Sequence, residues 1–257
     1  MDHGNVIIRF ENVSFAYDGD YPVLDEADFS IRENSKITIM GQNGAGKSTI
    51  LKMILGEVKP TGGMIHLTKG STVAIGRQVM PREWTSDTVR AFFARAFTEE
   101  LYDLDRRIAD VLEVVNLQAP LEKVIGEFSG GQQARLLLAF ALIQDSDILL
   151  LDEPTNNLDR DGIDHLTGFL MMYQKTVMVI SHDADFLNAF TEGVLHLDVY
   201  THKTDMYVGN YYNVLEEIAA RLERDRMKNA RLLKEAQDRK DKINFFANKG
   251  GKMRKLA

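Results

Sequence analysis

The sequence predicts an α/β fold in which a mixed, largely parallel sheet is joined to a group of helices. Residues 36–40 form a short, apolar and β-branched run, residues 41–48 form a glycine-rich turn, and residues 49–55 have helical composition. Residues 148–151 are apolar without alternation, which is typical of a strand buried on both faces of a parallel sheet. Apolar residues recur at helical spacing over residues 88–115, which predicts helices with core and interhelical contacts in a helical subdomain.

The glycine-rich turn has the spacing G-x-x-x-x-G-K-S and joins the predicted strand to the predicted helix. Such a turn directs backbone N–H groups and the positive end of a helix at an anion. Lys47 is placed to reach the β- and γ-phosphates of a nucleotide, and the Ser48 hydroxyl is placed to bind Mg²⁺. The alternative is a glycine-rich turn without a ligand. The residues expected to contact the nucleotide here are Gly41, Asn43, Gly44, Ala45, Gly46, Lys47, Ser48 and Thr49.

The composition indicates a globular protein without thiol chemistry. Hydrophobic residues make up 44% of the 257-residue chain, and cysteine is absent, which excludes disulfides and zinc–thiolate sites. The longest unbroken apolar run covers residues 136–143, whereas a membrane-spanning helix needs about 18 or more apolar residues. The first residues lack the basic start and apolar core of a signal peptide. We therefore expect a cytoplasmic protein without membrane insertion.

Charge is distributed unevenly along the chain, whose formal net charge is −7. Residues 221–257 contain 13 Lys/Arg and 5 Asp/Glu, a net charge of +8. Residues 1–220 therefore carry a net charge of −15. A basic tail on an acidic body can face a polyanion. A solvated helix with mixed charges explains the tail equally well.

Two residues are candidates for nucleotide contacts on weaker grounds. Residues 6–15 and 24–31 are predicted strands, and Tyr17 follows the first of them. An aromatic ring just ahead of the phosphate loop can stack on a base, although a surface tyrosine fits the pattern as well. Gln78 leaves the predicted strand 72–75 beside the phosphate site. It is a candidate to bind Mg²⁺ or to hold a water, whereas an exposed loop glutamine usually has no such function.

A second helix N-terminus suited to anions follows the helical region. Ser129 is a good N-cap, and Gly130 and Gly131 leave the backbone N–H groups of the first turn uncovered. Gln132 completes the element ahead of the apolar helical run 134–143. This second anion site need not serve the same nucleotide as the phosphate loop.

Polar side chains lie at the ends of two predicted strands. Asp152 and Glu153 follow the apolar run 148–151, and His182 follows the predicted strand 176–180. Sites in α/β proteins form at the carboxyl ends of parallel strands. Asp152 is therefore placed to hold Mg²⁺, and Glu153 is placed to polarise an attacking water. The alternatives are a pair of carboxylates with a structural role and a histidine that only makes structural hydrogen bonds.

Taken in order, these motifs resemble those of an ABC-type ATPase domain, a P-loop NTPase fold with a mixed sheet and a helical subdomain. The resemblance covers roughly residues 6–212, and the Ser-Gly-Gly-Gln element is its most specific part. It implies that two such domains enclose two ATP molecules head to tail. Each ATP would lie between the phosphate loop of one domain and the Ser129 helix of the other.

The same resemblance assigns roles to individual residues. It implies that Glu153 is the general base, that His182 senses the γ-phosphate, and that Gln78 couples the metal to the partner. The residues implied to contribute to the metal site are Ser48, Gln78 and Asp152. The residues implied to face the opposing nucleotide are Ser129, Gly130, Gly131 and Gln132. Two further residues, Asn157 and Asp159, are implied to lie in a loop at the interface between the two domains.

Within that superfamily the sequence resembles the ABC-F branch, whose members have two ATPase domains in one chain joined by a helical hairpin. The run at residues 152–159, the Ser-His-Asp at residues 181–183, and the Tyr-Val-Gly-Asn-Tyr run at residues 207–211 before a long charged helix carry this resemblance. Ala184 departs from it, because the branch usually shows Arg at this position. The departure puts in doubt any contact that this Arg would make.

The expected organisation is an ATP-binding domain over residues 1–210, with a helical subdomain at about 88–145, and a basic helical linker over 211–257. The linker is expected to be one helix to about residue 246, followed by a turn at residues 248–252. We expect the chain to be the first half of a longer protein that is cut within the hairpin. The second ATPase domain would then lie in the missing half or come from a second copy.

Three functions remain open at this level. The first is an ABC-F factor on the ribosome, with a basic linker that reaches rRNA and tRNA. The second is the ATPase subunit of a membrane transporter, and the third is a nucleotide-gated scaffold with little hydrolysis. The run around Asn156, which resembles that of the ABC-F branch, and the linker-like tail favour the first. On the first reading ATP and Mg²⁺ are the cofactors, and hydrolysis by a single isolated domain is expected to be weak.

Overall fold

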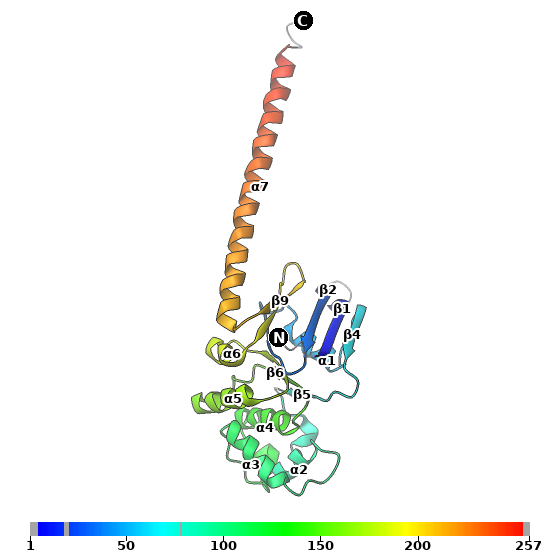
Figure 1. Cartoon of the computed structure of the whole chain (residues 1–257), viewed down its shortest axis with the longest axis vertical. Coiled ribbons are helices and arrows are strands. Elements are labelled where there is room, and N and C mark those ends of the chain that lie inside the picture. The colour runs from blue at the N-terminus through cyan, green and yellow to red at the C-terminus, as the bar shows by residue number, and fades with distance from the viewer. Residues whose placement is uncertain (1–4, 18–20, 78, 254–257) are drawn as a thin grey trace. The chain divides into compact units, whose positions relative to one another are not determined.

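The computed structural model describes residues 5–17, 21–77 and 79–253, and the chain divides into two compact units, Met1–Tyr212 and Asn213–Ala257. Gln78 lies outside the described residues. Figure 1 labels the helices and strands. The strands are β1 (Val6–Tyr17), β2 (Tyr21–Arg32), β3 (Lys36–Gly41), β4 (Gly62–Leu67), β5 (Val73–Gly76), β6 (Ile148–Asp152), β7 (Thr176–Ile180), β8 (Gly193–Leu197) and β9 (Thr204–Val208). The α-helices are α1 (Lys47–Ile54), α2 (Val89–Ala94), α3 (Leu104–Val114), α4 (Gly130–Ile143), α5 (Arg160–Met172), α6 (Ala184–Phe190) and α7 (Tyr211–Met253), and short 3-10 turns lie at Arg82–Trp84 and Ile125–Glu127.

The central sheet of the first unit has six strands in the order β5-β6-β7-β3-β8-β9. All neighbours are parallel except β8 and β9, which are antiparallel. Side chains of β6 alternate between two cores: Ile148 and Leu150 pack in one, and Leu149 and Leu151 pack in the other. The prediction of a mixed α/β fold with strands buried on both faces is therefore confirmed.

A second, three-stranded antiparallel sheet in the order β2-β1-β4 covers one face of the central sheet. Its apolar side chains share a core with α1 and with β3, β6, β7 and β8. Phe10 and Phe29 stack there at a ring-centroid distance of 4.3 Å, and Phe10 is fully buried. This sheet places the end of β1 and the start of β2 beside the turn between β3 and α1.

Helices α2 to α6 form the other core against the opposite face of the central sheet. Here the structure refines the expectation of helical periodicity over residues 88–115. Two helices, α2 and α3, form in this region, and the segment between them at residues 95–103 is not helical. This segment contains neither glycine nor proline, so no local sequence signal predicts the interruption.

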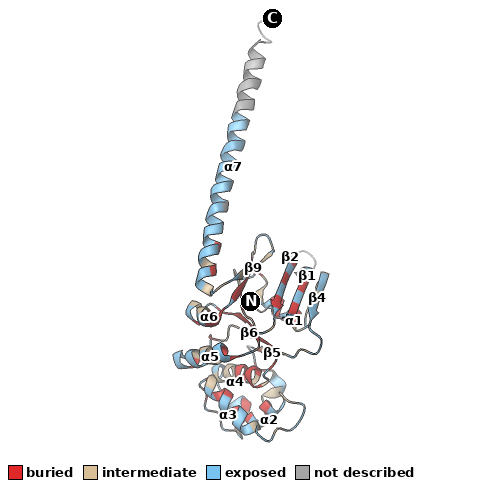
Figure 2. Cartoon of the chain, in the orientation of Figure 1, coloured by how far each residue is buried: buried red, intermediate tan, exposed pale blue. Residues whose placement is uncertain are grey.

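Helix α7 accounts for nearly all of the described part of the second unit. The expectation of a turn at residues 248–252 is wrong, because the helix continues through Gly250 and Gly251 to Met253. A glycine costs about 1 kcal/mol relative to alanine in a helix but does not forbid it. The described side chains between residues 221 and 241 are exposed, including Leu222 and Leu232 at 53% each (Figure 2). Within the described ranges, no helix is both long and apolar enough to cross a bilayer.

Candidate nucleotide-binding site

The turn between β3 and α1 has a backbone that only glycine accommodates at two positions. Gly44 and Gly46 have φ angles of 83° and 97°, in the left-handed region that disfavours other residues. A Cβ at Gly46 would also lie 2.3 Å from the Cγ1 atom of Val23. A Cβ at Gly44 would meet no atom within 4 Å, so this part of the turn is open to a ligand. The turn therefore combines a fixed backbone with an accessible surface.

Lys47 begins α1, and its ammonium group is held inside the turn. The Nζ atom donates hydrogen bonds to the backbone oxygens of Gly41, at 2.8 Å, and of Gln42, at 3.1 Å. These carbonyls keep the positive charge at the mouth of the turn, close to the N-terminal N–H groups of the helix. Such a combination binds phosphate well. Ala45 in the turn is buried, with only 5% of its surface exposed.

A cavity of about 840 Å³ opens over this turn. It brings together residues that lie far apart in the sequence. Its lining includes Tyr17, Asn43, Gly44, Gly46, Lys47, Ser48, Thr49, Asp152, Glu153, Asn156 and His182. Among the predicted contact residues, Gly41 and Ala45 support the turn from behind and do not line the cavity.

Tyr17 is the last residue of β1 and lies at the edge of the cavity. The residue is 43% exposed, and its hydroxyl lies 3.2 Å from the Thr49 hydroxyl of α1. Phe15 supports it from the side in an edge-to-face contact at 4.9 Å. The ring is therefore held in place while part of its face stays available for stacking.

Ser48 and Asp152 form the pair that fits a divalent cation. The Ser48 hydroxyl donates to Oδ2 of Asp152 at 2.9 Å. A hydroxyl and a carboxylate from two distant segments therefore lie next to each other in the cavity lining. Mg²⁺ in proteins usually takes one or two carboxylates and completes its shell with water and substrate phosphates. This donor set fits that pattern. Gln78, the third predicted ligand, lies outside the described residues.

Glu153 has two unusual features for a glutamate. Its backbone φ is 52°, in the left-handed region, and its N–H donates to the backbone oxygen of Ile180 in β7 at 2.8 Å. Its side chain is 13% exposed, and Oε2 is buried with no hydrogen-bond partner among the described residues. Strained backbones and unpaired buried polar atoms concentrate at functional sites.

The environment of Glu153 also changes its titration. Burial raises the pKa of the carboxyl above its ordinary value, and the nearby His182 imidazole opposes this increase. The two side chains lie 3.3 Å apart, from Nε2 of His182 to Oε1 of Glu153. The His182 side chain is 69% exposed, so one side of the imidazole faces the open cavity. A carboxylate with one free acceptor can take a proton from a water held beside it.

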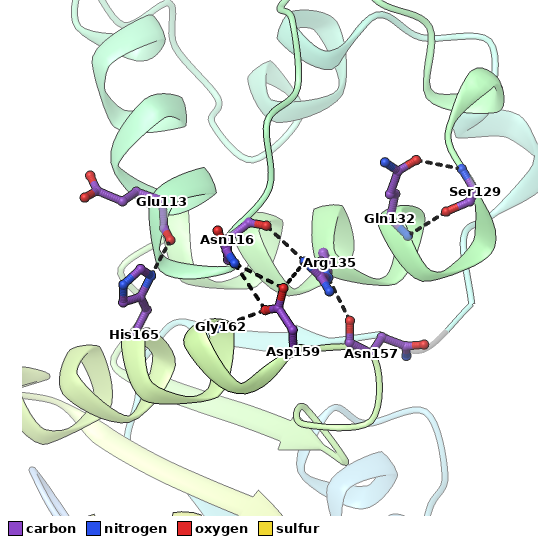
Figure 3. Close-up of polar contacts among 9 residues, drawn as sticks. All are labelled: Glu113, Asn116, Ser129, Gln132, Arg135, Asn157, Asp159, Gly162 and His165. Atoms are coloured by element: carbon purple, nitrogen blue, oxygen red, sulfur yellow. Dashed lines mark hydrogen bonds and ion pairs between the residues drawn. The ribbon is translucent and has the colours of Figure 1, made fainter.

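Ser129 begins α4 with a complete capping box. Its hydroxyl accepts from the Gln132 N–H at 3.4 Å, and the Gln132 side chain accepts from the Ser129 N–H at 3.0 Å (Figure 3). Gly130 and Gly131 are exposed, and a Cβ on Gly130 would meet no atom within 4 Å. None of these four residues lines the cavity over the phosphate loop. The phosphate loop and the Ser129 helix end are thus two separate places at which a helix N-terminus is accessible.

Asn157 and Asp159, the predicted interface residues, lie in the loop between β6 and α5 and contact two other elements. The Asp159 carboxylate caps α5 by accepting from the Gly162 N–H at 3.0 Å, and it accepts twice from Nδ2 of Asn116 at 3.2 Å. The Asn116 contact is the largest of several that lower the pKa of Asp159. Part of the predicted interface loop is therefore held by contacts within the chain.

Arg135 and Asn116 are residues that the sequence analysis missed. Arg135 on α4 donates from Nε to the backbone oxygen of Asn157 at 2.7 Å and from Nη1 to the backbone oxygen of Asn116 at 2.9 Å (Figure 3). It ties the helix that starts at Ser129 to the loop that follows Glu153. One sequence signal was present, because Arg135 is the only charged residue of helix α4 and directly precedes its apolar run 136–143.

We expect Arg135→Ala to lower the free energy of unfolding by about 1.5–3 kcal/mol, because hydrogen bonds made by a charged group contribute that much and two carbonyls would lose their donor. Urea unfolding followed by circular dichroism measures this change. Arg82→Ala is the matched control, since Arg82 is exposed; it should change stability by less than about 0.5 kcal/mol. Equal stability of the two variants would contradict a structural role for Arg135.

Comparison with known proteins agrees with this geometry. The family model described as "ABC transporter" matches residues 24–156, more than half of the chain. The energy-dependent translational throttle protein EttA of Mycobacterium tuberculosis (strain CDC 1551 / Oshkosh) is 31% identical, over 84% of this chain and 45% of EttA. YheS of Escherichia coli (strain K12), described as an ATP-binding protein, is 36% identical, over 80% of this chain and 32% of YheS. The chain thus spans less than half the length of these relatives.

Solved structures show the same fold at low sequence identity. The ATP-binding subunit of an ABC transporter superimposes with a TM-score of 0.71 at 19% identity, covering 83% of this chain and 93% of that one. The dimeric structure of MJ0796, a bacterial ABC transporter cassette, gives a TM-score of 0.66 at 23% identity, over 79% and 98%. These matches confirm the predicted fold, and the relatives agree with the ABC-F resemblance drawn from the motifs. The chain therefore belongs to the ABC transporter family, as an ABC-type ATPase domain.

Proposed function

We propose that residues 1–210 are the ATP-binding and ATP-hydrolysing domain of a cytoplasmic ABC-F protein that acts on the ribosome in translation. Residues 88–145 are its helical subdomain, and residues 211–257 are the basic linker to a second ATPase domain. The two domains together form the composite sites, because each supplies a phosphate loop to one ATP and a Ser129-type helix end to the other.

The proposed roles follow from the positions in the cavity. Tyr17 stacks on the base, while Lys47 and the backbone N–H groups of the turn bind the phosphates. Ser48 and Asp152, together with Gln78, would hold Mg²⁺. When bound, Mg²⁺ would neutralise phosphate charge and help to orient the substrate. Glu153 accepts the proton of the attacking water, and His182 stabilises the carboxylate and contacts the γ-phosphate.

A single observation carries the hydrolytic part of the proposal. Glu153 holds a buried carboxylate oxygen without a described partner, and it lines the same cavity as Lys47 and the Ser48–Asp152 pair. A buried acceptor of this kind costs free energy unless a ligand or water satisfies it. A water placed for attack on the γ-phosphate would do so. The exposed Ser129 helix end, which does not line this cavity, supports the need for a second domain.

The action on the ribosome rests on two observations. One relative is named an energy-dependent translational throttle protein, and residues 221–257 of this chain carry a net charge of +8. A basic helix can bind rRNA or tRNA through the phosphate backbone. A second candidate function is the ATPase subunit of a membrane transporter, which the ABC transporter subunits among the similar structures favour.

Co-sedimentation with ribosomes tests the proposed function. We expect the natural protein carrying Glu153→Gln to pellet with ribosomes in the presence of ATP and Mg²⁺. Binding should weaken steeply as salt rises, because contacts to RNA phosphates release counterions. The Lys47→Ala variant is the control and should remain in the supernatant. Absence of the Glu153→Gln protein from the pellet at low salt, with co-purification of a membrane protein, would favour the transporter instead.

A further inference from the structure

A second large cavity lies between α3 and α5, away from the nucleotide site. We call it the α3–α5 groove; its volume is about 760 Å³. It shares no lining residue with the cavity over the phosphate loop. Figure 3 shows one edge of it, where His165 of α5 faces the backbone oxygen of Glu113 in α3. Its lining includes Asp110, Glu113, Asp164, Gly168, Phe169 and Met172.

Gly168 lies in the interior of α5 and lines the groove. A Cβ built on it would meet no atom within 4 Å, and its φ is not in the left-handed region. Neither close packing nor backbone geometry therefore requires glycine here. A glycine inside a helix costs about 1 kcal/mol relative to alanine. Its effect on the surface is to leave the floor of the groove without a side chain, so that another molecule can approach the helix backbone.

Apolar side chains flank this open floor. Phe169 and Val114 are half-buried, and Met172 is 79% exposed at the end of α5. Methionine is flexible and polarisable, and it is common on surfaces that bind partners. An exposed apolar patch beside a cavity is a feature of interaction sites. The groove therefore offers apolar contact as well as space.

The rim of the groove is acidic. Asp110, Glu113 and Asp164 are exposed, and no ion pair links them to another described residue. Asp145 also lines the groove, but Lys175 neutralises it through an ion pair at 3.0 Å. Lys175 itself lines the groove, and the one other described lining residue that can carry a positive charge is His165, whose Nδ1 lies 3.2 Å from the backbone oxygen of Glu113. Three carboxylates thus surround an apolar floor with at most one histidine to balance them.

We propose that the α3–α5 groove docks a basic amphipathic segment of a partner protein. Apolar side chains of that segment would lie on the floor at Gly168, Phe169 and Met172, and its Lys or Arg side chains would pair with the acidic rim. This complementarity selects against nucleic acid, because the three carboxylates repel phosphates. The proposal concerns a surface outside the nucleotide site, so its success or failure is independent of ATP hydrolysis.

A binding assay with the 257-residue chain tests this proposal. The probe is a fluorescein-labelled helical peptide built of Lys and Leu at amphipathic spacing, and fluorescence anisotropy reports its binding. We expect binding to the wild-type chain, with affinity at least tenfold lower in Gly168→Gln and in the triple variant Asp110→Asn/Glu113→Gln/Asp164→Asn. Gly168→Gln removes a glycine from a helix interior, so the melting temperature of this variant should not fall. Misfolding then cannot explain its lower affinity for the peptide.

Matched controls separate the groove from the general acidity of the body. Met171→Gln adds a polar side chain to α5 outside the groove lining, and Glu99→Gln/Glu100→Gln/Glu127→Gln removes three charges elsewhere. Both controls should bind the peptide as the wild-type chain does. The proposal is overturned by equal affinity of the groove variants and the controls, by absence of binding, or by equal binding of a Glu/Leu peptide. Dimerisation of the wild-type chain that Gly168→Gln abolishes would identify a second copy as the occupant and would also overturn it.

Discussion

Replacing Glu153 by glutamine is expected to lower ATP turnover by about 10²–10⁴-fold, the contribution typical of a positioned general base. The amide keeps the shape of the side chain but cannot accept a proton from water. ATP binding should persist, because Lys47, the backbone of the turn and the Ser48–Asp152 pair are unchanged. Two assays on the natural protein check this result. Phosphate release measures turnover, and retention of ATP on a filter measures ATP binding.

Glu127→Gln is the matched control for this experiment, since Glu127 is exposed and does not line the cavity. Its turnover should equal that of the wild-type protein. Unchanged turnover in Glu153→Gln would contradict the assignment of Glu153 as the general base. If Glu153→Gln loses both ATP binding and turnover, the carboxylate instead has a structural role in the site, such as an ion pair with His182.

The second large effect is expected at the phosphate loop, where Lys47→Ala should weaken ATP binding by about tenfold to more than a hundredfold. A hydrogen bond to a charged group contributes about 1.5–3 kcal/mol, and 1.4 kcal/mol corresponds to a factor of ten in affinity. Lys47 is the only Lys or Arg among the described residues that line the cavity. Without it, the phosphates would face Asp152 and Glu153 with less compensating charge.

Titration calorimetry with ATP and Mg²⁺ measures the affinity of the Lys47→Ala chain. Lys52→Ala is the control, because Lys52 is exposed in the last turn of the same helix α1 and does not line the cavity. The Lys52→Ala chain loses the same positive charge as the Lys47→Ala chain, but it should bind ATP with the affinity of the wild-type chain. Equal affinity of the Lys47→Ala and wild-type chains would show that the turn binds something other than nucleotide phosphates.

Much of the fold was predictable because its signals are local. The apolar runs of β6 and β7 identify strands buried on both faces, and the structure places them in the centre of the sheet. The Ser129 N-cap could be predicted from residue types alone, since a capping box depends on residues three positions apart. The gathering of Lys47, Asp152 and His182 in one cavity followed from the carboxyl ends of parallel strands.

Other features depend on contacts that no local pattern encodes. The partners of Arg135 lie 19 and 22 residues away, at the end of α3 and in the loop before α5. The left-handed backbone of Glu153 is held by a hydrogen bond to the neighbouring strand β7, so propensity does not predict it. The continuation of α7 through Gly250 and Gly251 overrides the usual preference of paired glycines for a turn. The α3–α5 groove likewise forms only when two distant helices pack.

The rate of ATP hydrolysis per molecule, measured against protein concentration for this 257-residue chain, tests most directly whether the site is shared between two domains. A shared site predicts that the dilute, monomeric chain binds ATP but releases almost no phosphate, and that the specific rate rises only as the molecules associate. A high specific rate that stays constant down to concentrations at which sedimentation shows a strict monomer would contradict it.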